Sequence, residues 1–270
     1  MEELQQFQEF KGKVALVTGG TKGIGFGAAR RLAQGGCSVV ICGSRTDDGE
    51  EAASMLRNEQ LEVRFKHADV RYSDKVQELI RFTIATYGRL DILVNSAGVQ
   101  RYGDATETSE FVWDEVLDIN LKGMFLTSKY AIPEMRKAGK GAIVNVSSVQ
   151  AFASQKGVVA YTASKGGINA MTRAMALDHA HEQIRVNVVC PASVDTPMLR
   201  WAADQHKGEQ TQEEVLASWG NMHPIGRVGT MEEVGELIAF LASDKAGFIT
   251  GAEYKIDGGM LAALGVHLPE

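Results

Sequence analysis

Cysteine, proline and long apolar runs are scarce in this chain of 270 residues. The three cysteines, Cys37, Cys42 and Cys190, lie in apolar surroundings and form no C-x-x-C pair, which argues against a zinc site or a redox pair. The five prolines form no linker, and no apolar run approaches the roughly 18 residues of a membrane helix. We therefore expect a cytoplasmic protein with reduced cysteines and no contact with a membrane.

Positive charge is also in short supply, because 34 acidic residues outnumber 28 lysines and arginines and give a formal net charge of −6. Nucleic acids and anionic membranes need a basic face, so neither is expected as a partner. The start, "MEELQQFQEF", lacks the basic and apolar regions of an export signal. A composition of 44% hydrophobic and 23% charged residues is typical of a compact globular protein.

Two common catalytic signatures are missing as well. The six histidines form no H-E-x-x-H motif, and no serine lies in a G-x-S-x-G elbow. The sequence thus predicts neither a catalytic metal nor a serine hydrolase.

Apolar, β-rich runs alternate with helix-like stretches along most of the chain. The predicted strands are residues 13 to 18, 38 to 43, 62 to 70, 89 to 95, 141 to 148, 184 to 191 and 252 to 258. The predicted helices are residues 24 to 34, 48 to 58, 73 to 87, 111 to 137, 160 to 181 and 231 to 242. This alternation predicts an α/β fold of the doubly wound (Rossmann) type, with a parallel seven-stranded sheet covered by helices on both faces.

No linker or repeat divides the chain, so we predict a single domain over residues 1 to 270. Residues 192 to 228 are polar and mixed, and they are expected to form a substrate-binding loop.

A serine, a tyrosine and a lysine occur in the short segment "NVSSVQAFASQKGVVAYTASKGG". Tyr161 and Lys165 are spaced to lie on one helix face a turn apart, so the ammonium is expected to lower the tyrosine pKa from about 10. Ser148 ends an apolar strand that would bring its hydroxyl to the same place. Taken singly, the three residues are more typical of a half-buried aromatic, a surface cation and a strand-end turn residue, so the rest of the chain has to decide.

The first predicted strand leads into the turn "TGGTKGIG", where Gly19, Gly23 and Gly25 open an Ala-rich helix. Glycines at a strand–turn–helix junction let backbone N–H groups approach a pyrophosphate.

From residue 10 to 260 the chain resembles the short-chain dehydrogenase/reductase family. The resemblance rests on "TGGTKGIG", "HADV", "NSAG", "DINLKG", "NVSS", "YTASK", "IRVNVVCPASVDTPM" and "GAEYKIDGG" in that order. It implies a cofactor-binding half at 10 to 100 and a catalytic half at 101 to 260. Two residues depart from the family pattern, Ser96 for the second asparagine of "NNAG" and Ala192 for the glycine after the sixth strand.

By this resemblance the protein is an NAD(P)-dependent oxidoreductase that interconverts a secondary alcohol and a ketone. Tyr161 would be the general acid/base, Lys165 would support it, Ser148 would bind the reacting oxygen, and Asn120 would hold a water in the proton path. Ser148, Tyr161 and Gln150 would contact substrate. The implied cofactor-binding residues are Gly19, Thr21, Lys22, Gly23, Ile24, Gly25, Ser44, Arg45, Asp69, Val70, Asn95, Ala97, Gly98, Tyr161, Lys165, Pro191, Val194 and Thr196.

The choice of nicotinamide cofactor depends on the end of the second predicted strand. Gly43 stands where an acidic residue would favour NAD(H), and Ser44 and Arg45 follow it. With Lys22 as a second cation, the sequence favours NADP(H), with NAD(H) as the alternative. Arg45 would lose this role if it paired with Asp47 or Asp48.

Polar amides and aromatics are expected around the substrate at Gln100, Arg101, Tyr102, Gln150 and Phe152. They favour a sugar, a polyol or a small functionalised ketone.

Reduction of a 3-oxoacyl group on acyl carrier protein is an alternative, supported by the cluster Arg136, Lys137 and Lys140. A non-catalytic dinucleotide sensor is a second alternative, from another class. The resemblance also implies a homotetramer, with one interface on the helices at 111 to 137 and 160 to 181 and another covered by the apolar end "MLAALGVHL".

Overall fold

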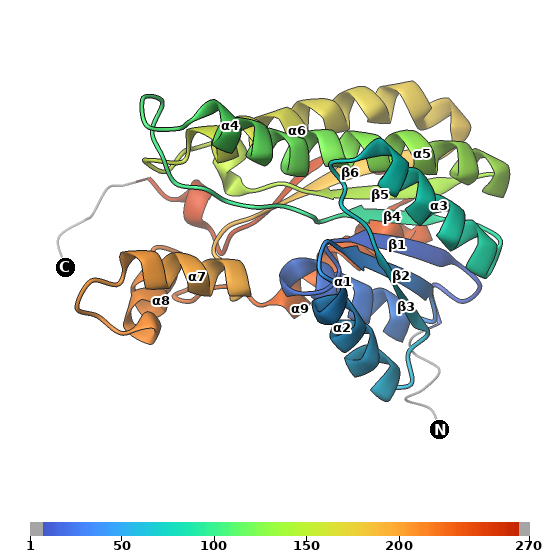
Figure 1. Cartoon of the computed structure of the whole chain (residues 1–270), viewed down its shortest axis with the longest axis horizontal. Helices are drawn as coiled ribbons and strands as arrows, with labels where there is room; N and C mark the ends of the chain where they lie inside the picture. Colours follow the sequence, from blue (N-terminus) through green and yellow to red (C-terminus); the bar gives the residue numbers. More distant parts are fainter. Residues whose placement is uncertain (1–7, 265–270) are drawn as a thin grey trace.

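The computed structural model describes residues 8 to 264 and gathers its strands into one parallel seven-stranded sheet (Figure 1). The strand order is β3-β2-β1-β4-β5-β6-β7, and every neighbouring pair is parallel. The strands are β1 (Val14–Thr18), β2 (Ser38–Gly43), β3 (Val63–His67), β4 (Ile92–Asn95), β5 (Gly141–Val146), β6 (Ile184–Pro191) and β7 (Glu253–Ile256). The predicted doubly wound fold is confirmed.

Helices cover both faces of this sheet (Figure 1). One face carries α1 (Gly23–Gln34), α2 (Thr46–Asn58) and α9 (Met231–Ala242). The other carries α3 (Ser73–Tyr87), α5 (Gly123–Ala138) and α6 (Val159–His179), with α4 (Glu110–Leu117) against α6. Two further helices, α7 (Pro197–His206) and α8 (Gln212–Gly220), project beyond the carboxyl ends of the strands.

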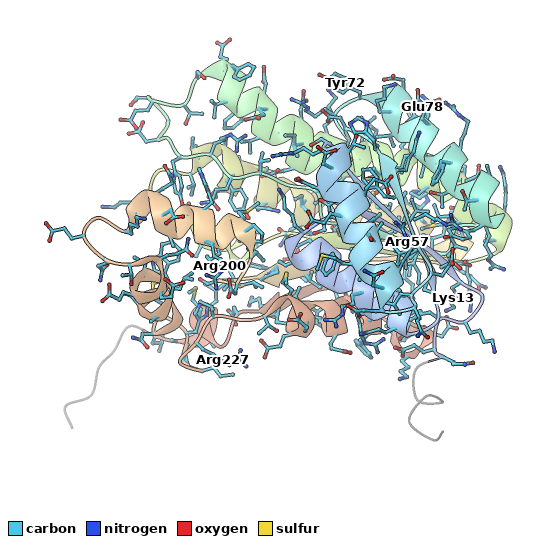
Figure 2. The ribbon with its side chains drawn as sticks, turned by 60° about the horizontal axis from the view of Figure 1, so that its bottom comes forward. Lys13, Arg57, Tyr72, Glu78, Arg200 and Arg227 are labelled. Atoms are coloured by element: carbon cyan, nitrogen blue, oxygen red, sulfur yellow. The ribbon has the colours of Figure 1, made fainter. Side chains whose placement is uncertain are left out.

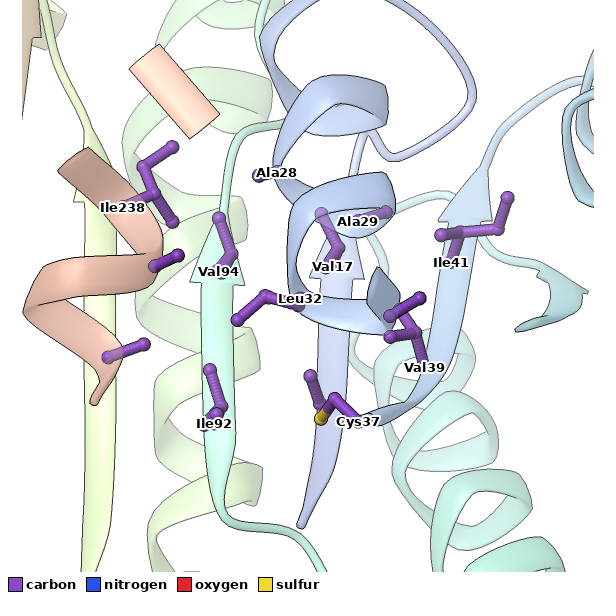
Figure 3. Packing of buried hydrophobic residues seen from close by; sticks show 14 of the residues in the cluster. Val17, Ala28, Ala29, Leu32, Cys37, Val39, Ile41, Ile92, Val94 and Ile238 are labelled. Carbon is purple, nitrogen blue, oxygen red and sulfur yellow. The ribbon is translucent and has the colours of Figure 1, made fainter. Parts of the chain in front are cut away.

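The alternation of side chains along the strands creates two apolar layers. Val17 and Val94 face α1 and α9, where they pack with Leu32 and Ile238 (Figure 3). Leu16, the neighbour of Val17, points to the opposite layer under α3 and α5. A strand that is buried on both faces needs apolar side chains at nearly every position. This explains the continuous apolar runs of the predicted strands.

The predicted helix at 111 to 137 is wrong as one regular helix. A π-helical turn, Asp118–Lys122, separates α4 from α5 and buries Asn120. The chain stays helical through the wider turn, so its apolar periodicity continues and conceals the break.

Residues 192 to 228 are not the continuous loop that was expected, because they contain α7 and α8. Thr196 caps α7 by accepting a hydrogen bond from the Leu199 N–H, and Thr211 with Glu214 forms a capping box at α8. The strand predicted at 62 to 70 ends at His67, and the one at 89 to 95 begins at Ile92. Among the described residues, no helix is long and apolar enough to cross a membrane.

Candidate active site

The turn between β1 and α1 brings the backbone close to the end of β4. Gly19 and Gly23 have φ angles of 64° and 58°, which favour glycine. A Cβ atom on Gly19 would lie 2.8 Å from Ala97 Cα, and one on Gly25 would lie 2.3 Å from the Gly19 oxygen. Lys22, at the N-cap of α1, makes no side-chain cap. The first N–H groups of the helix therefore suit an anion such as pyrophosphate.

Ser148, Tyr161 and Lys165 come together beyond the end of β5. Ser148 lies just beyond the strand and lines the same cavity as Tyr161, close enough for its side chain to favour the charged form of the tyrosine. Tyr161 and Lys165 lie one turn apart on α6, with the lysine Nζ 5.2 Å from the centre of the tyrosine ring. Lys165 Nζ also donates to the Val146 oxygen at 3.1 Å. The side chains of Ser148, Tyr161 and Lys165 are therefore all buried next to one another.

Burial sets the protonation of this group. It raises the pKa of Tyr161 to about 12, although the interaction with Ser148 opposes the rise. It also lowers the pKa of Lys165 to about 8. The expected net lowering of the tyrosine pKa is therefore not found for the protein alone, because desolvation of the phenol outweighs the interaction with Ser148 that favours its charged form.

Asn120 joins the loop after β4 to α6. Its Nδ2 donates to the Val99 oxygen at 2.9 Å and to Ser164 Oγ at 3.1 Å, and its Oδ1 accepts from the Val99 N–H at 2.8 Å. A Cβ atom on Gly98 would lie 3.4 Å from this Oδ1 and 3.9 Å from Lys165 Nζ. Because both Nδ2 protons are used, a water at Asn120 must donate to it rather than accept from it.

Asn95 differs from its expected place along a cofactor. Its side chain is fully buried beneath the strand ends, where Nδ2 donates to Asn145 Oδ1 at 2.9 Å and Oδ1 accepts from Thr127 Oγ1 at 2.6 Å. Asn145 continues the chain to Thr172 of α6 at 2.9 Å. The side chain of Asn95 is thus used inside the fold, and only its main chain is left for a ligand.

Asp69 and Val70, expected beside an adenine, follow β3. Arg71 holds the Asp69 carboxylate through several hydrogen bonds, the shortest at 2.6 Å, and the pKa of Asp69 is lowered although burial opposes this. Val70 is buried against Gly123 at the start of α5.

Two predicted phosphate-binding cations share one acidic partner. Lys22 Nζ lies 3.6 Å and Arg45 Nε 3.4 Å from Asp48 Oδ2. The pairing of Arg45 with Asp48, expected to remove it from a phosphate, is therefore present. The side chains of Lys22 and Arg45 remain 60% and 75% exposed, however, so solvent weakens both pairs and leaves the two cations available to a stronger anion. The Ser44 oxygen contacts His67 Nε2 at 3.2 Å, and Thr21 packs against the end of β2.

The segment after β6 closes the site from the other side. Val194 forms a β-bridge with Gly229. A Cβ atom on Gly23 would lie 3.3 Å from Thr196 Cγ2, so the starts of α7 and α1 are adjacent. Pro191, Val194 and Thr196, together with Ile24, line one cavity with Ser148 and Tyr161.

This cavity has a volume of about 530 Å³, in the usual range for small-molecule sites. Gln100, Tyr102 and Gln150 line it as expected, but Arg101 and Phe152 do not. Arg101 pairs with Glu115, with both contacts at 2.9 Å, and Phe152 is 44% exposed.

Seven cavity residues were missed in the sequence: Ser147, Val149, Ala153, Ser154, Gln155, Met260 and Leu261. The last two belong to the apolar end assigned to an interface, whose residues from 265 onward lie outside the described part. Their position in the sequence could have indicated this, because both residues follow β7 and the carboxyl ends of parallel strands lie at one edge of the sheet, where the site is.

Comparisons with known proteins agree with this geometry. The family model described as enoyl-(acyl carrier protein) reductase matches residues 19 to 261. A 3-oxoacyl-[acyl-carrier-protein] reductase of Chlamydia muridarum is 37% identical over 92% of this chain and 97% of its own length. Cis-4-hydroxycyclohexanecarboxylate dehydrogenase of Sinomonas cyclohexanicum is 38% identical over 94% of this chain and 99% of its own.

Among solved structures, the ligand-free aldohexose dehydrogenase of Thermoplasma acidophilum superposes with a TM-score of 0.90. It is 36% identical and covers 98% of this chain and all of its own. The chain belongs to the short-chain dehydrogenase/reductase family, as its motifs predicted. It is an oxidoreductase acting on CH–OH groups, and enzymes of this family use a nicotinamide dinucleotide as cofactor.

Proposed function

We propose that this enzyme interconverts a small secondary alcohol and its ketone, with Tyr161 as the general acid/base. The observation that carries the proposal is that Ser148 and Tyr161 line one cavity together with Ile24 and Val194, with Lys165 beside the tyrosine ring. A bound nicotinamide supplies or accepts the hydride, so the protein has to move one proton.

Each side chain then has one task. Ser148 donates a hydrogen bond to the reacting oxygen, and Tyr161 gives its proton to that oxygen as the ketone is reduced. A phenol with a pKa of about 12 keeps its proton until the oxygen becomes basic. In the reverse direction the ammonium of Lys165 stabilises the phenolate, and Asn120 orients a water that relays the proton.

The residues around the strand ends would hold the cofactor. The glycine turn with Thr21 would bind the pyrophosphate, and Asp69 and Val70 would contact the adenine. The main chain from Asn95 to Gly98 would lie along the middle of the cofactor. The nicotinamide would be contacted by Pro191, Val194 and Thr196. We favour NADP(H) over NAD(H), because Lys22 and Arg45 converge at the end of β2, where no acidic side chain ends the strand. The division into halves at residues 10 to 100 and 101 to 260 stays a prediction.

Replacement of the tyrosine hydroxyl tests the proposal. Tyr161→Phe should lower kcat about 100-fold or more, because the proton donor is gone, while cofactor binding persists. The measurement is nicotinamide absorbance against a panel of alcohols and ketones, with binding followed separately by calorimetry. Tyr130→Phe is the matched control, since its hydroxyl contacts Ser73 at 2.7 Å on the far side of α5 from the cavity. Full activity of Tyr161→Phe would refute the assignment.

Reduction of carrier-linked 3-oxoacyl groups is less well supported. The relative from Chlamydia muridarum favours it, but the basic cluster expected to dock an acidic carrier is internally paired. Arg136 pairs with Glu182, Lys137 with Glu134 and Lys140 with Asp244.

We also propose that the enzyme is a homotetramer. Exposed apolar side chains lie on the predicted interface helices, with Phe111 of α4 78% exposed, Phe125 of α5 49% and Leu177 of α6 81%. Exposed apolar groups concentrated on neighbouring helices mark surfaces for association.

A further inference from the structure

The wall of the active-site cavity restricts the substrate more narrowly than the reaction does. We infer that the substrate is a compact, uncharged alcohol or ketone, and neither a carboxylate nor a sugar. Of the substrates that the sequence favoured, this keeps the small functionalised ketone and gives up the sugar. This inference rests on the proposed function, and it concerns the part of the substrate that lies away from the reacting carbon.

The first step is the absence of charge. Among the described residues that line the cavity, none is Asp, Glu, Lys, Arg or His. An anionic group held in such a cavity would lose its hydration without gaining a counter-charge, which is strongly unfavourable. Lys165 lies behind the ring of Tyr161, at the reacting end, and its ammonium donates to the Val146 oxygen.

Two arginines next to the wall residues are engaged elsewhere. Arg101, between Gln100 and Tyr102 in the chain, is held by Glu115 through two hydrogen bonds of 2.9 Å. Arg200 of α7, labelled in Figure 2, is held by both oxygens of Asp195 at 2.7 and 2.8 Å. Neither guanidinium is left to pair with a substrate carboxylate without breaking a bidentate ion pair.

The second step is the apolar side of the cavity. It is formed by α7, the end of α8 and the segment after β7 through Met198, Leu199, Trp219, Met222, Met260 and Leu261. A sugar carries a hydroxyl on nearly every carbon, and hydroxyls facing these side chains would have no hydrogen-bond partner. Unpaired buried hydroxyls cost binding free energy, so this side selects a hydrocarbon surface.

The third step is the polar side, formed by the segment between β5 and α6. Gln150 Nε2 lies 3.4 Å from Gln155 Oε1, and Gln150 Oε1 accepts from Thr162 Oγ1 at 3.3 Å. Gln155 and Tyr102 line the cavity beside this pair. These neutral groups can accept or donate to one neutral oxygen at the far end of a substrate, such as an ester, a ketone or a second hydroxyl.

A matched set of ring alcohols tests the inference. The probes are cyclohexanol, cis-4-hydroxycyclohexanecarboxylate, the methyl ester of that acid and glucose, each assayed with NADP and with NAD. The acid and its ester share the ring and the reacting alcohol and differ in charge and in one methyl group. We expect kcat/KM for the ester to exceed that for the acid by about 100-fold or more, well beyond the effect of a methyl group. Glucose should be at least as poor as the acid.

Binding gives a readout that does not need turnover. In the presence of cofactor, cyclohexanone should raise the melting temperature of the enzyme, and cyclohexanecarboxylate and glucose should not. Acid turnover equal to ester turnover, or a preference for glucose, would overturn the inference. Binding of cyclohexanone without turnover of any alcohol would instead refute the proposed function and leave the inference standing.

A substitution provides an independent check. Gln150→Lys puts a cation on the polar side and should raise the acid-to-ester ratio of kcat/KM about 10-fold or more, because the carboxylate gains a counter-charge. Gln150→Met, of similar length and neutral, should leave the ratio low. If the lysine variant folds and its ratio stays unchanged, the wall does not select by charge. If it fails to fold, the acid–ester comparison in the unaltered enzyme still decides.

Discussion

Asp48 lies where two cations expected to recognise an extra phosphate meet. Its carboxylate is within 3.6 Å of Lys22 Nζ and within 3.4 Å of Arg45 Nε. A 2′-phosphate and this carboxylate would compete for the same charges. The preference for NADP over NAD therefore depends on how well the 2′-phosphate competes with the Asp48 carboxylate for the two cations.

Asp48→Asn should tighten NADP binding by about 3-fold, because it frees both cations at an exposed site where each ion pair is weak. Arg45→Ala should weaken NADP binding, and neither change should alter NAD binding appreciably. Calorimetry with each cofactor measures the four affinities, and the effects should fade at about 1 M salt. Weaker NADP binding by Asp48→Asn would mean that the carboxylate positions the cations instead of competing.

Residue spacing allowed the sequence to predict which polar groups meet, and little of what surrounds them. The one-turn spacing of Tyr161 and Lys165 and the strand end at Ser148 place all three correctly. The raised pKa of the tyrosine could not be predicted, because burial depends on the packing of many distant residues. Met260 and Leu261 were missed although their position after β7 placed them at the same edge of the sheet as the site.

At the scale of elements, the N-terminus of α9 connects the fold to the site. Thr230 and Glu233 form a capping box, and Arg227 donates to the Glu233 carboxylate at 2.6 and 2.9 Å. Gly229, just before the box, bridges Val194 of the cavity wall. Chiefly through Arg227, the pKa of Glu233 falls from 4.5 to about 2.

Glu233→Gln should lower the free energy of unfolding at pH 7 by about 1 kcal/mol or less, since the carboxylate is partly screened by solvent. A depressed pKa means that the carboxylate contributes fully above pH 4.5 and loses its contribution as the pH falls toward 2. The difference between wild type and variant, measured by urea unfolding, should therefore shrink below pH 4.5. Glu232→Gln, outside the capping box, is the control, and a difference that grows in acid would contradict the prediction.

Elements that pack against the sheet along their whole length were predictable, and the two helices beyond the strand ends were not. The sheet strands and α1, α3 and α9 follow from apolar runs because their packing is uniform. The helices α7 and α8 bury few apolar side chains, so only the threonine caps, such as Thr211 with Glu214, marked them. The π-helical turn at Asn120 could not be seen in the sequence, because the apolar periodicity continues through it.

For the whole molecule, the exposed apolar residues on α4, α5 and α6 predict an assembly. At micromolar concentration the protein should sediment at about four times the 29.2 kDa of one chain. The double variant Phe111→Lys, Leu177→Lys should shift this toward smaller species, because lysine ammonium groups would have to be desolvated in the interface. Met55→Lys, on α2 and 53% exposed, is the control. A wild-type mass of one chain would refute the tetramer.

The buried chain of amides from Asn95 through Asn145 to Thr172 has a consequence for folding. Asn95 is opposite Asn145 in the pairing of β4 with β5, and both turn to the layer under α5 and α6. A slip of one residue between the strands would turn one amide into the all-apolar layer of Val94 and Ile238. A folding intermediate with this slipped register would thus carry an unsatisfied buried amide. Its free energy would be raised, so the native register would be favoured. The main-chain protons of β4 and β5 should be among the last to exchange with heavy water.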